Sequence, residues 1–282
     1  MISIVNKNDI NKISVQKVTP TIFPDGTSQV WKLDLDVYKN GSVKIVWSFE
    51  QEAELIWVNQ LIALLDSAEI AIDELYMPYL PYARQDKSVS NTTTFAKAVF
   101  LRSLLLDKVG KLTTLDAHSE HAAVKSYSAQ PYINKAILEF KPDVLVFPDE
   151  GAYERYQNQI EQNDFEVLVL DKVRDQATGA IKSLTLDAQK TSSVLSDNQK
   201  EKHYRMLIID DICDGGATFN HAALFLHEKY HCEIALYVTH GIFSKGYENM
   251  INAGIAEFFT TQSLIKNISG YALIEMENEN DI

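Results

Sequence analysis

The sequence contains few cysteines, fewer basic than acidic residues, and no long hydrophobic run. Cys213 and Cys232 are the only cysteines among 282 residues and lack CxxC spacing, which excludes a disulfide framework and favours a reducing cytoplasm. The chain has 26 Lys and Arg residues against 39 Asp and Glu, a formal net charge of −13. This charge argues against nucleic acid or an anionic membrane as the main partner, because both require a basic surface.

No segment resembles a signal peptide or approaches the roughly 18 apolar residues of a membrane span. The chain also lacks low-complexity tracts and short-period repeats. Its 46% hydrophobic and 23% charged residues are ordinary for a globular protein with one large or two ordinary domains. We therefore expect a cytoplasmic protein that can still bind an anionic small molecule where a few Lys and Arg side chains converge.

The segment 206–218, MLIIDDICDGGAT, carries the strongest chemical signal. Four apolar residues bounded by acids and glycines predict a buried strand of a parallel sheet, with a polar loop at its carboxyl end. Asp210 and Asp211 can hold a vicinal diol or a hydrated magnesium ion, and the glycines before Thr218 let backbone N–H groups close around a phosphate. The alternative is a helix-capping aspartate followed by a turn that happens to contain glycine.

Strand-like and helix-like segments alternate along both halves of the chain. This pattern predicts an α/β protein with two mainly parallel sheets flanked by helices rather than one long sheet. Lys141-Pro142 interrupts the alternation, so we expect an N-terminal domain over 1–140 and a C-terminal domain over 141–282. The strand predicted at 144–147 leads through Asp149 into a helix that begins near Tyr153, a unit suited to ligating a cation at its turn.

Several polar residues lie in loops after predicted strands. Pro78 and Pro81 rigidify the segment that presents Arg84, a guanidinium suited to phosphate binding. Lys172 and Arg174 alternate with apolar residues and would point to one side of an extended segment, although spacing alone favours a charged hairpin.

His118 follows a predicted strand and could be a metal ligand, a phosphate contact or a capped core residue. A zinc pair with His121 lacks an evident third ligand.

Taken together, these segments resemble the ribose-phosphate pyrophosphokinase family over almost the whole chain. The matching motifs occur in order: FPDG at 23–26, PYARQDK at 81–87, LDAHS at 115–119, FPDEGAYER at 147–155, DKVRD at 171–175, IIDDICDGGAT at 208–218 and THGIFS at 239–244. The resemblance implies two phosphoribosyltransferase-type domains and an ATP site completed by a neighbouring subunit of a homo-oligomer.

The same resemblance assigns roles to individual residues. Phe23 and Asp25 would reach the adenine of ATP in a neighbouring subunit, and Arg84 and Gln85 would line the ATP site. His118 and Asp149 would help position Mg²⁺. Lys172 and Arg174 would lie on a mobile loop over the transferring phosphates. Asp210 and Asp211 would bind the ribose hydroxyls. The 5-phosphate would be bound by Asp214, Gly215, Gly216, Ala217 and Thr218.

The implied reaction transfers the β,γ-diphosphate of ATP to the anomeric hydroxyl of ribose 5-phosphate and releases AMP. No side chain is an obvious general base. The chain departs from the family pattern at Thr27, where Glu is usual, and at Ala152, where a second glycine is usual. Its phosphate loop lacks one hydroxyl, because Gly215-Gly216-Ala217 replaces the usual Thr-Gly-Gly between Asp214 and Thr218. The chain is also shorter than the common bacterial form, which argues against that form's phosphate-activated control.

Three alternatives stay open at this point. The looser phosphate loop is compatible with a 5-substituted acceptor such as ADP-ribose, whose product would feed NAD synthesis. A non-catalytic regulatory paralogue is a second alternative, although such proteins tend to lose the loop cations or metal ligands that this chain retains. A phosphoribosyltransferase that consumes the diphosphate is the third, but it would not need the 23–26 or 81–87 segments.

Overall fold

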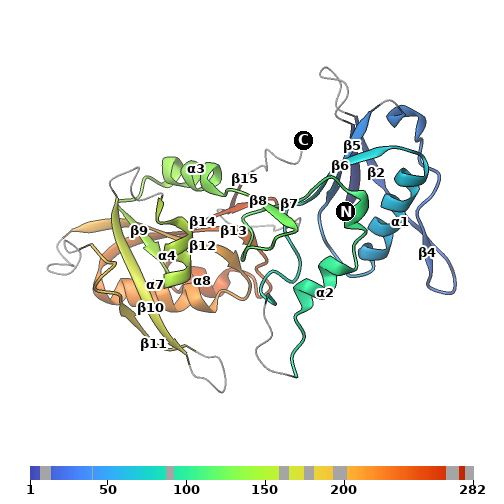
Figure 1. Cartoon of the computed structure of the whole chain (residues 1–282). Coiled ribbons are helices and arrows are strands. Elements are labelled where there is room, and N and C mark those ends of the chain that lie inside the picture. Colours follow the sequence, from blue (N-terminus) through green and yellow to red (C-terminus); the bar gives the residue numbers. More distant parts are fainter. Residues whose placement is uncertain are drawn as a thin grey trace. The chain divides into compact units, whose positions relative to one another are not determined.

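The computed structural model describes residues 1–6, 14–39, 41–86, 92–158, 165–174, 181–192, 202–264 and 273–276 (Figure 1). The chain forms two compact units. The first consists mainly of Met1–Ser128 and the second of Ala129–Gln262, with short C-terminal segments assigned to each. The predicted boundary at 140 falls at the end of a helix of the second unit, and the assignment of functional domains to 1–140 and 141–282 stays a prediction.

The first unit contains a six-stranded sheet in the order β2-β1-β5-β6-β7-β8. Strands β5 to β8 are parallel, whereas β1 pairs antiparallel with both β2 and β5. A separate antiparallel pair, β3 with β4, forms a hairpin whose turn contains the 23–26 motif. The elements are β1 (Ile2–Asn6), β2 (Ser14–Val18), β3 (Thr21–Ile22), β4 (Ser28–Gln29), η1 (Asp36–Tyr38), β5 (Ser42–Trp47), α1 (Glu54–Ser67), β6 (Ala71–Met77), α2 (Ala96–Arg102), η2 (Leu106–Lys108), β7 (Leu112–Leu115) and β8 (Val124–Tyr127).

The core of the first unit lies between this sheet and helices α1 and α2. Helix α1 buries Val58, Leu61, Ile62 and Leu65, which recur at the three- and four-residue spacing of one helix face. Trp47 at the end of β5 packs against Phe100 of α2, with ring centroids 5.8 Å apart. This contact holds α2 close to the carboxyl end of β5.

The second unit contains a seven-stranded sheet in the order β11-β10-β9-β12-β13-β14-β15. Every pair is parallel except β10 with β11, which form an antiparallel hairpin. The predicted architecture of two mainly parallel sheets is therefore confirmed. The elements are α3 (Gln130–Phe140), β9 (Val144–Phe147), α4 (Glu150–Tyr156), β10 (Glu166–Arg174), β11 (Ile181–Leu186), β12 (His203–Cys213), α7 (Ala217–Lys229), β13 (His231–Gly241), α8 (Glu248–Asn252), β14 (Ile255–Thr261) and β15 (Leu273–Met276).

Helices cover both faces of the second sheet. Figure 1 shows α3 on one side of this sheet and α7 with α8 on the other. Alternate residues of the central strands, including Val146, Ile208 and Leu236, pack with Phe219 and Leu226 of α7 in one core cluster. Because both faces are covered, β9 reads as the continuous apolar run VLVF, all four residues buried.

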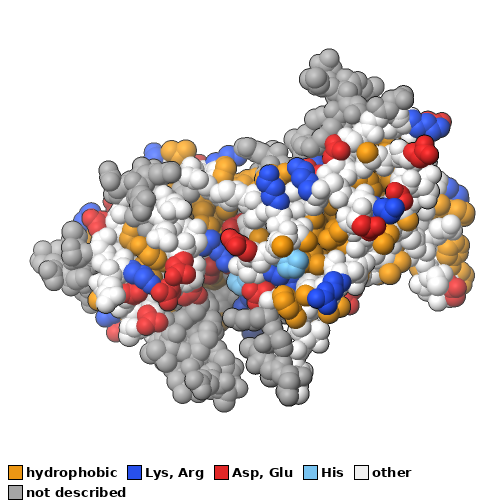
Figure 2. Space-filling model, in the orientation of Figure 1, with side chains coloured by type: hydrophobic (Ala, Val, Ile, Leu, Met, Phe, Trp, Pro, Cys, Tyr) orange, Lys and Arg blue, Asp and Glu red, His pale blue; other side chains and the backbone are white. Residues whose placement is uncertain are grey.

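The surface carries charged side chains of both signs (Figure 2). Figure 2 shows acidic and basic side chains interspersed over the visible face of the described residues. In the described part of the chain, no helix combines the length and apolar character needed to cross a membrane.

Candidate functional site

The acid pair lies on β12, the strand between β9 and β13 in the second sheet. The strand continues to Cys213, so Asp210 and Asp211 lie within its last residues rather than beyond its end as expected. Pairing of Ile212 with His240 and of Cys213 with Gly241 extends the ladder past the acids. The acids are therefore held by strand backbone, which is more rigid than a loop.

The two carboxylates have different surroundings. Asp211 is buried and forms an ion pair and hydrogen bond with the Arg155 guanidinium of α4. Asp210 is half-buried, and its Oδ1 accepts a hydrogen bond of 2.9 Å from the Asp211 backbone N–H. Burial, followed by the charges of Asp211 and Asp149, raises the pKa of Asp210 well above its ordinary value. The site therefore favours a ligand that donates hydrogen bonds or brings positive charge to Asp210.

Asp149 belongs to the same group of acids. It caps the N-terminus of α4, where its Oδ1 accepts a hydrogen bond of 2.9 Å from the backbone N–H of Ala152. The structure thus brings together Asp149, Asp210 and Asp211 from separate segments, as the parallel topology predicts for strand ends at one sheet edge.

The loop after β12 turns directly into α7. Gly216 has φ of 76°, a left-handed conformation that favours glycine, and helix α7 begins at Ala217. A Cβ at Gly216 would lie 2.8 Å from Met250 Sδ, so α8 closes over this turn. Backbone N–H groups at the start of a helix form an anion-binding concavity, and Gly215, Thr218 and their neighbours lie at this start.

Asp214 is held by the segment that follows β13. The Ser244 hydroxyl donates to Asp214 Oδ1 at 2.5 Å, and the Ser244 backbone N–H donates to the Asp214 carbonyl at 3.1 Å. The predicted THGIFS segment therefore lies beside the predicted phosphate loop.

The backbone of Lys172 and Arg174 lies in β10, opposite Leu184 and Ile181 of β11. This pairing is the charged hairpin that spacing alone favoured. A register shift falls between Val173 and Arg174. The side chains of Lys172 and Arg174 lie outside the described residues, so their role stays a prediction.

In the first unit, Phe23 and Asp25 occupy the tip of the β3–β4 hairpin. The Phe23 ring meets Trp31 edge-on, with centroids 6.4 Å apart. Thr27 donates to Asp25 Oδ1 from its hydroxyl at 2.7 Å and from its backbone N–H at 3.0 Å. The hydroxyl bond and then the backbone bond lower the pKa of Asp25. Thr27, which departs from the family pattern, thus organises the turn that carries Asp25.

The loop that carries Arg84 and Gln85 is anchored on both sides. Tyr82 has φ of 61°, and its hydroxyl donates to Glu52 just before α1. This hydrogen bond is the largest cause that raises the pKa of Tyr82 to about 12. The Gln85 carbonyl accepts a hydrogen bond of 3.2 Å from the Lys97 backbone N–H. The expected rigidity of this loop therefore comes from tertiary contacts as well as from its prolines.

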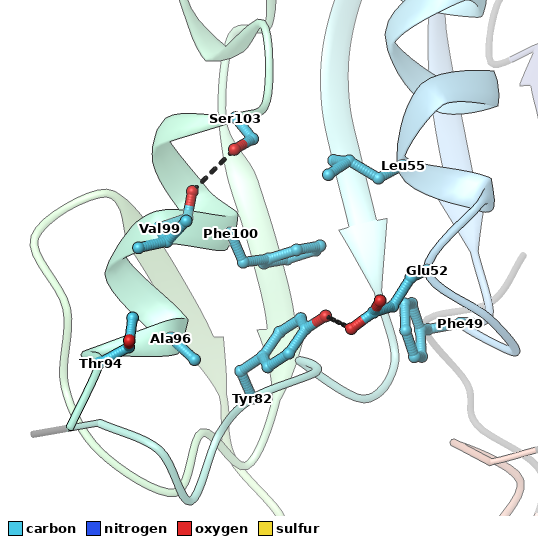
Figure 3. A pocket seen from close by; sticks show the side chains of 9 residues that line it. All are labelled: Phe49, Glu52, Leu55, Tyr82, Thr94, Ala96, Val99, Phe100 and Ser103. Carbon is cyan, nitrogen blue, oxygen red and sulfur yellow. Dashed lines mark hydrogen bonds between the residues drawn. The ribbon is translucent and has the colours of Figure 1, made fainter. Parts of the chain in front are cut away.

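Two cavities adjoin this loop. One, of about 350 Å³, is lined mainly by aromatic and aliphatic side chains, with the Tyr82–Glu52 pair along one edge (Figure 3). The other, of about 370 Å³, is lined by Gln85, Tyr79, Glu52 and their neighbours. Gln85 thus contributes to a hollow large enough to hold part of a small ligand.

His118 is half-buried in the loop after β7. The neighbouring Ser119 receives the buried Lys97 ammonium, with Lys97 Nζ 2.5 Å from Ser119 Oγ. The first turn of α2 therefore contacts both the 81–86 loop and the 116–119 loop. Within the described residues, no group of three or more His, Cys, Asp or Glu side chains is arranged to hold a metal ion.

Sequence reasoning gave no role to Arg155, Lys97, Ser244 or Lys245. Arg155 lies in the 147–155 motif and Ser244 in the 239–244 motif, so these motifs could have pointed to both residues. Lys97 and Lys245 carried no signal in the sequence, because only the fold places Lys97 beside Ser119, and Lys245 beside Gly215.

The chain matches the family model described as "Phosphoribosyl transferase domain" over residues 113–274. A curated relative named ribose-phosphate pyrophosphokinase, from Sulfurisphaera tokodaii, is 25% identical over 96% of this chain and 92% of its own length. Another protein of that name, from Mycoplasmopsis pulmonis, is 25% identical over 91% of this chain and 79% of its own length.

A similar fold occurs in a solved structure titled phosphoribosylpyrophosphate synthetase from Mycobacterium smegmatis. Its TM-score is 0.76 at 20% identity, and the match covers 94% of this chain and 87% of that chain. The likeness extends across both units of the present structure.

Proposed function

This chain belongs to the phosphoribosyl transferase domain family, and we propose that it is an ATP-dependent ribose-phosphate diphosphokinase. It transfers the β,γ-diphosphate of ATP to the anomeric hydroxyl of ribose 5-phosphate, giving phosphoribosyl pyrophosphate and AMP. The observation that carries this proposal is the extent of similarity: the Sulfurisphaera tokodaii relative matches 96% of the chain and therefore both units. A phosphoribosyltransferase alone would account only for the second unit.

The acceptor site lies in the second unit. Asp210 and Asp211 accept hydrogen bonds from the two ring hydroxyls of the ribose, which fixes the orientation of its anomeric carbon. Arg155 holds Asp211 in a fixed orientation, because its guanidinium pairs with the buried carboxylate. The backbone N–H groups of the 214–218 loop and the N-terminus of α7 bind the 5-phosphate.

The first unit supplies the adenine contacts and the 81–86 loop, and the second unit supplies the cations assigned to the transferring phosphates. Arg84 and Gln85 contact ATP from the anchored 81–86 loop, and Phe23 and Asp25 reach the adenine of a neighbouring copy in a homo-oligomer. Lys172 and Arg174 of β10 supply positive charge to the transferring phosphates. Attack occurs at the β-phosphorus and AMP leaves, so the protein contributes alignment and charge stabilisation rather than a covalent intermediate.

Magnesium fits the donor set of this site. Mg²⁺ is usually held by one or two carboxylates together with substrate phosphates and water. The half-buried Asp149 lies close to Asp210, whose pKa is raised by burial and then by the charges of Asp211 and Asp149. Asp149 and His118 are the residues that we assign to it. When bound, the ion would neutralise charge on the ATP phosphate oxygens.

Steady-state assays with ATP and Mg²⁺ test the proposal. AMP should form only when ribose 5-phosphate is added, in equal amount to phosphoribosyl pyrophosphate. Lys172→Ala or Arg174→Ala should lower kcat by roughly 10²- to 10³-fold, because each removes charge that stabilises the transition state. ADP-ribose serves as the comparison acceptor. Faster turnover of ADP-ribose, or no acceptor-dependent AMP at all, would refute the assignment.

A further inference from the structure

Lys245 lies against the loop that we assign to the acceptor phosphate. A Cβ built on Gly215 would be 3.3 Å from Lys245 Cδ and 3.5 Å from its Cε. The aliphatic stem of Lys245 therefore covers the space that a side chain at position 215 would occupy. Position 215 is where the usual Asp-Thr-Gly-Gly-Thr loop carries its first hydroxyl.

The backbone around Lys245 is fixed to the same loop. The Ile242 and Phe243 N–H groups donate to the Cys213 carbonyl at 2.8 and 3.1 Å, and Ser244 binds Asp214 through its hydroxyl and its N–H. The 242–246 segment is thus joined to residues 213 and 214 by four hydrogen bonds. The approach of Lys245 to Gly215 follows from these bonds.

A cation near the 214–218 loop would offset the negative charge of the aspartates around it. Asp149, Asp210, Asp211 and Asp214 are acids close to a proposed phosphate site, and Arg155 is already paired with Asp211. Lys245 is solvent-exposed, and within the described part of the chain its ammonium makes no hydrogen bond or ion pair. Its charge is therefore available to an anion at the 214–218 loop.

We infer that Lys245 binds the phosphate group of the ribose 5-phosphate acceptor and replaces the hydroxyl that is absent at Gly215. This inference rests on the proposed function for the identity of the ligand. It also connects two sequence features: Gly215 leaves room for the lysine stem, and Lys245 supplies a charged donor where the loop has lost a neutral one. A charge-assisted hydrogen bond is roughly twice as strong as a neutral one, so the exchange maintains phosphate affinity.

Binding of ribose 5-phosphate to Lys245→Met, measured by titration calorimetry without ATP, tests the inference directly. Methionine keeps the length of the stem and removes the charge. We expect the Kd for ribose 5-phosphate, and its KM during turnover, to rise about 10- to 100-fold, as expected for losing a hydrogen bond to a charged group. The KM for ATP should stay within about twofold of the wild-type value, since nucleotide contacts are assigned elsewhere. Lys135→Met, at an exposed position of α3, is the matched control and should leave both constants unchanged.

A reciprocal exchange tests the connection between the two positions. Lys245→Gly alone should weaken ribose 5-phosphate binding, and adding Gly215→Thr should recover a substantial part of the loss. Gly215→Thr alone should weaken binding, because its Cβ displaces the lysine stem. Unchanged affinity in Lys245→Met, or no recovery in the double variant, would overturn the inference. A wild-type protein that binds ribose 5-phosphate but does not transfer diphosphate would instead refute only the proposed reaction.

Discussion

Asp210 and Asp211 are neighbours in sequence but differ in charge environment. Asp211 has a cationic partner in Arg155. At Asp210, burial, followed by the charges of Asp211 and Asp149, raises the pKa of the carboxyl group. Identical residue types on one strand therefore take different roles. Under the proposed function, Asp211 is a hydrogen-bond acceptor held in place by Arg155, and Asp210 is the carboxylate whose charge depends on what binds next to it.

Replacement of Arg155 should affect both stability and acceptor binding. Arg155→Met leaves the Asp211 carboxylate, 6% exposed, without its cation, and we expect the free energy of unfolding to fall by about 1–3 kcal/mol. Urea denaturation measures this change. The KM for ribose 5-phosphate should rise, since Asp211 loses its orientation. Lys39→Met, which breaks a solvent-exposed pair with Asp36, is the control and should change stability by less than about 1 kcal/mol. Equal effects of the two variants would contradict the role given to Arg155.

Thr27 should control the titration of Asp25. Its hydroxyl hydrogen bond is the largest cause that depresses the pKa of Asp25, so Thr27→Val should raise that pKa toward the ordinary aspartate value. Because the folded-state pKa is lowered, this interaction stabilises the folded hairpin above the unfolded-state pKa. The contribution is lost as pH falls through the folded-state value. Carboxyl ¹³C NMR titration measures the midpoint. Thr27→Ser retains the hydroxyl and should retain the low pKa; identical midpoints in the valine and serine variants would refute the assignment.

At the scale of elements, the turn between β12 and α7 requires glycine at position 216 for two separate reasons. Its φ of 76° disfavours any residue with a Cβ, and Met250 of α8 occupies the space where that Cβ would be. Backbone conformation and packing from a distant element thus specify the same residue. The proposed phosphate loop is shaped by α8 as well as by its own glycines.

A pair of glycine substitutions separates these two conditions. Gly26 also has a positive φ, of 84°, but nothing lies within 4 Å of a Cβ built there. Gly26→Ala should therefore lower stability by about 1–2 kcal/mol from backbone strain alone. Gly216→Ala should cost about 1–3 kcal/mol more, because its Cβ meets Met250. Differential scanning calorimetry of both variants gives the comparison. Similar losses would show that α8 does not constrain the loop.

The predicted strands and helices agree with the structure at some positions and differ from it at others, and each outcome has a physical reason. Strand β9 ends where predicted, because a continuous apolar run reflects burial directly. No element was predicted between residues 120 and 140, where β8 and α3 lie. In α3 the buried residues Tyr132, Ile133, Ala136 and Phe140 do follow helical spacing, so its signal was available. Strand β12 extends to Cys213 because its partner β13 extends to Gly241, which no local pattern in β12 reveals.

At the scale of the whole molecule, the proposed ATP site requires two copies of the chain. The hairpin with Phe23 and Asp25 would contribute to one copy's site, and Arg84 and Gln85 to the other's. Co-expression of Phe23→Ala and Arg84→Ala subunits, purified through two different tags, should restore activity that each variant lacks alone. Phe23→Ala mixed with Asp25→Ala is the control, since both defects lie in the same hairpin and should not complement. A mixture no more active than the average of its components would argue against a shared site.

The sequence by itself determined the two-sheet architecture, the acid pair and the order of the seven motifs, because burial patterns and motif chemistry are local properties of the chain. Tertiary structure alone decided that Arg155 neutralises Asp211, that Lys97 joins two loops, and that Lys245 lies over Gly215. These contacts join residues 22 to 56 positions apart. Strand pairing and helix packing set such contacts, and no local pattern encodes which distant side chain a carboxylate or a glycine will meet.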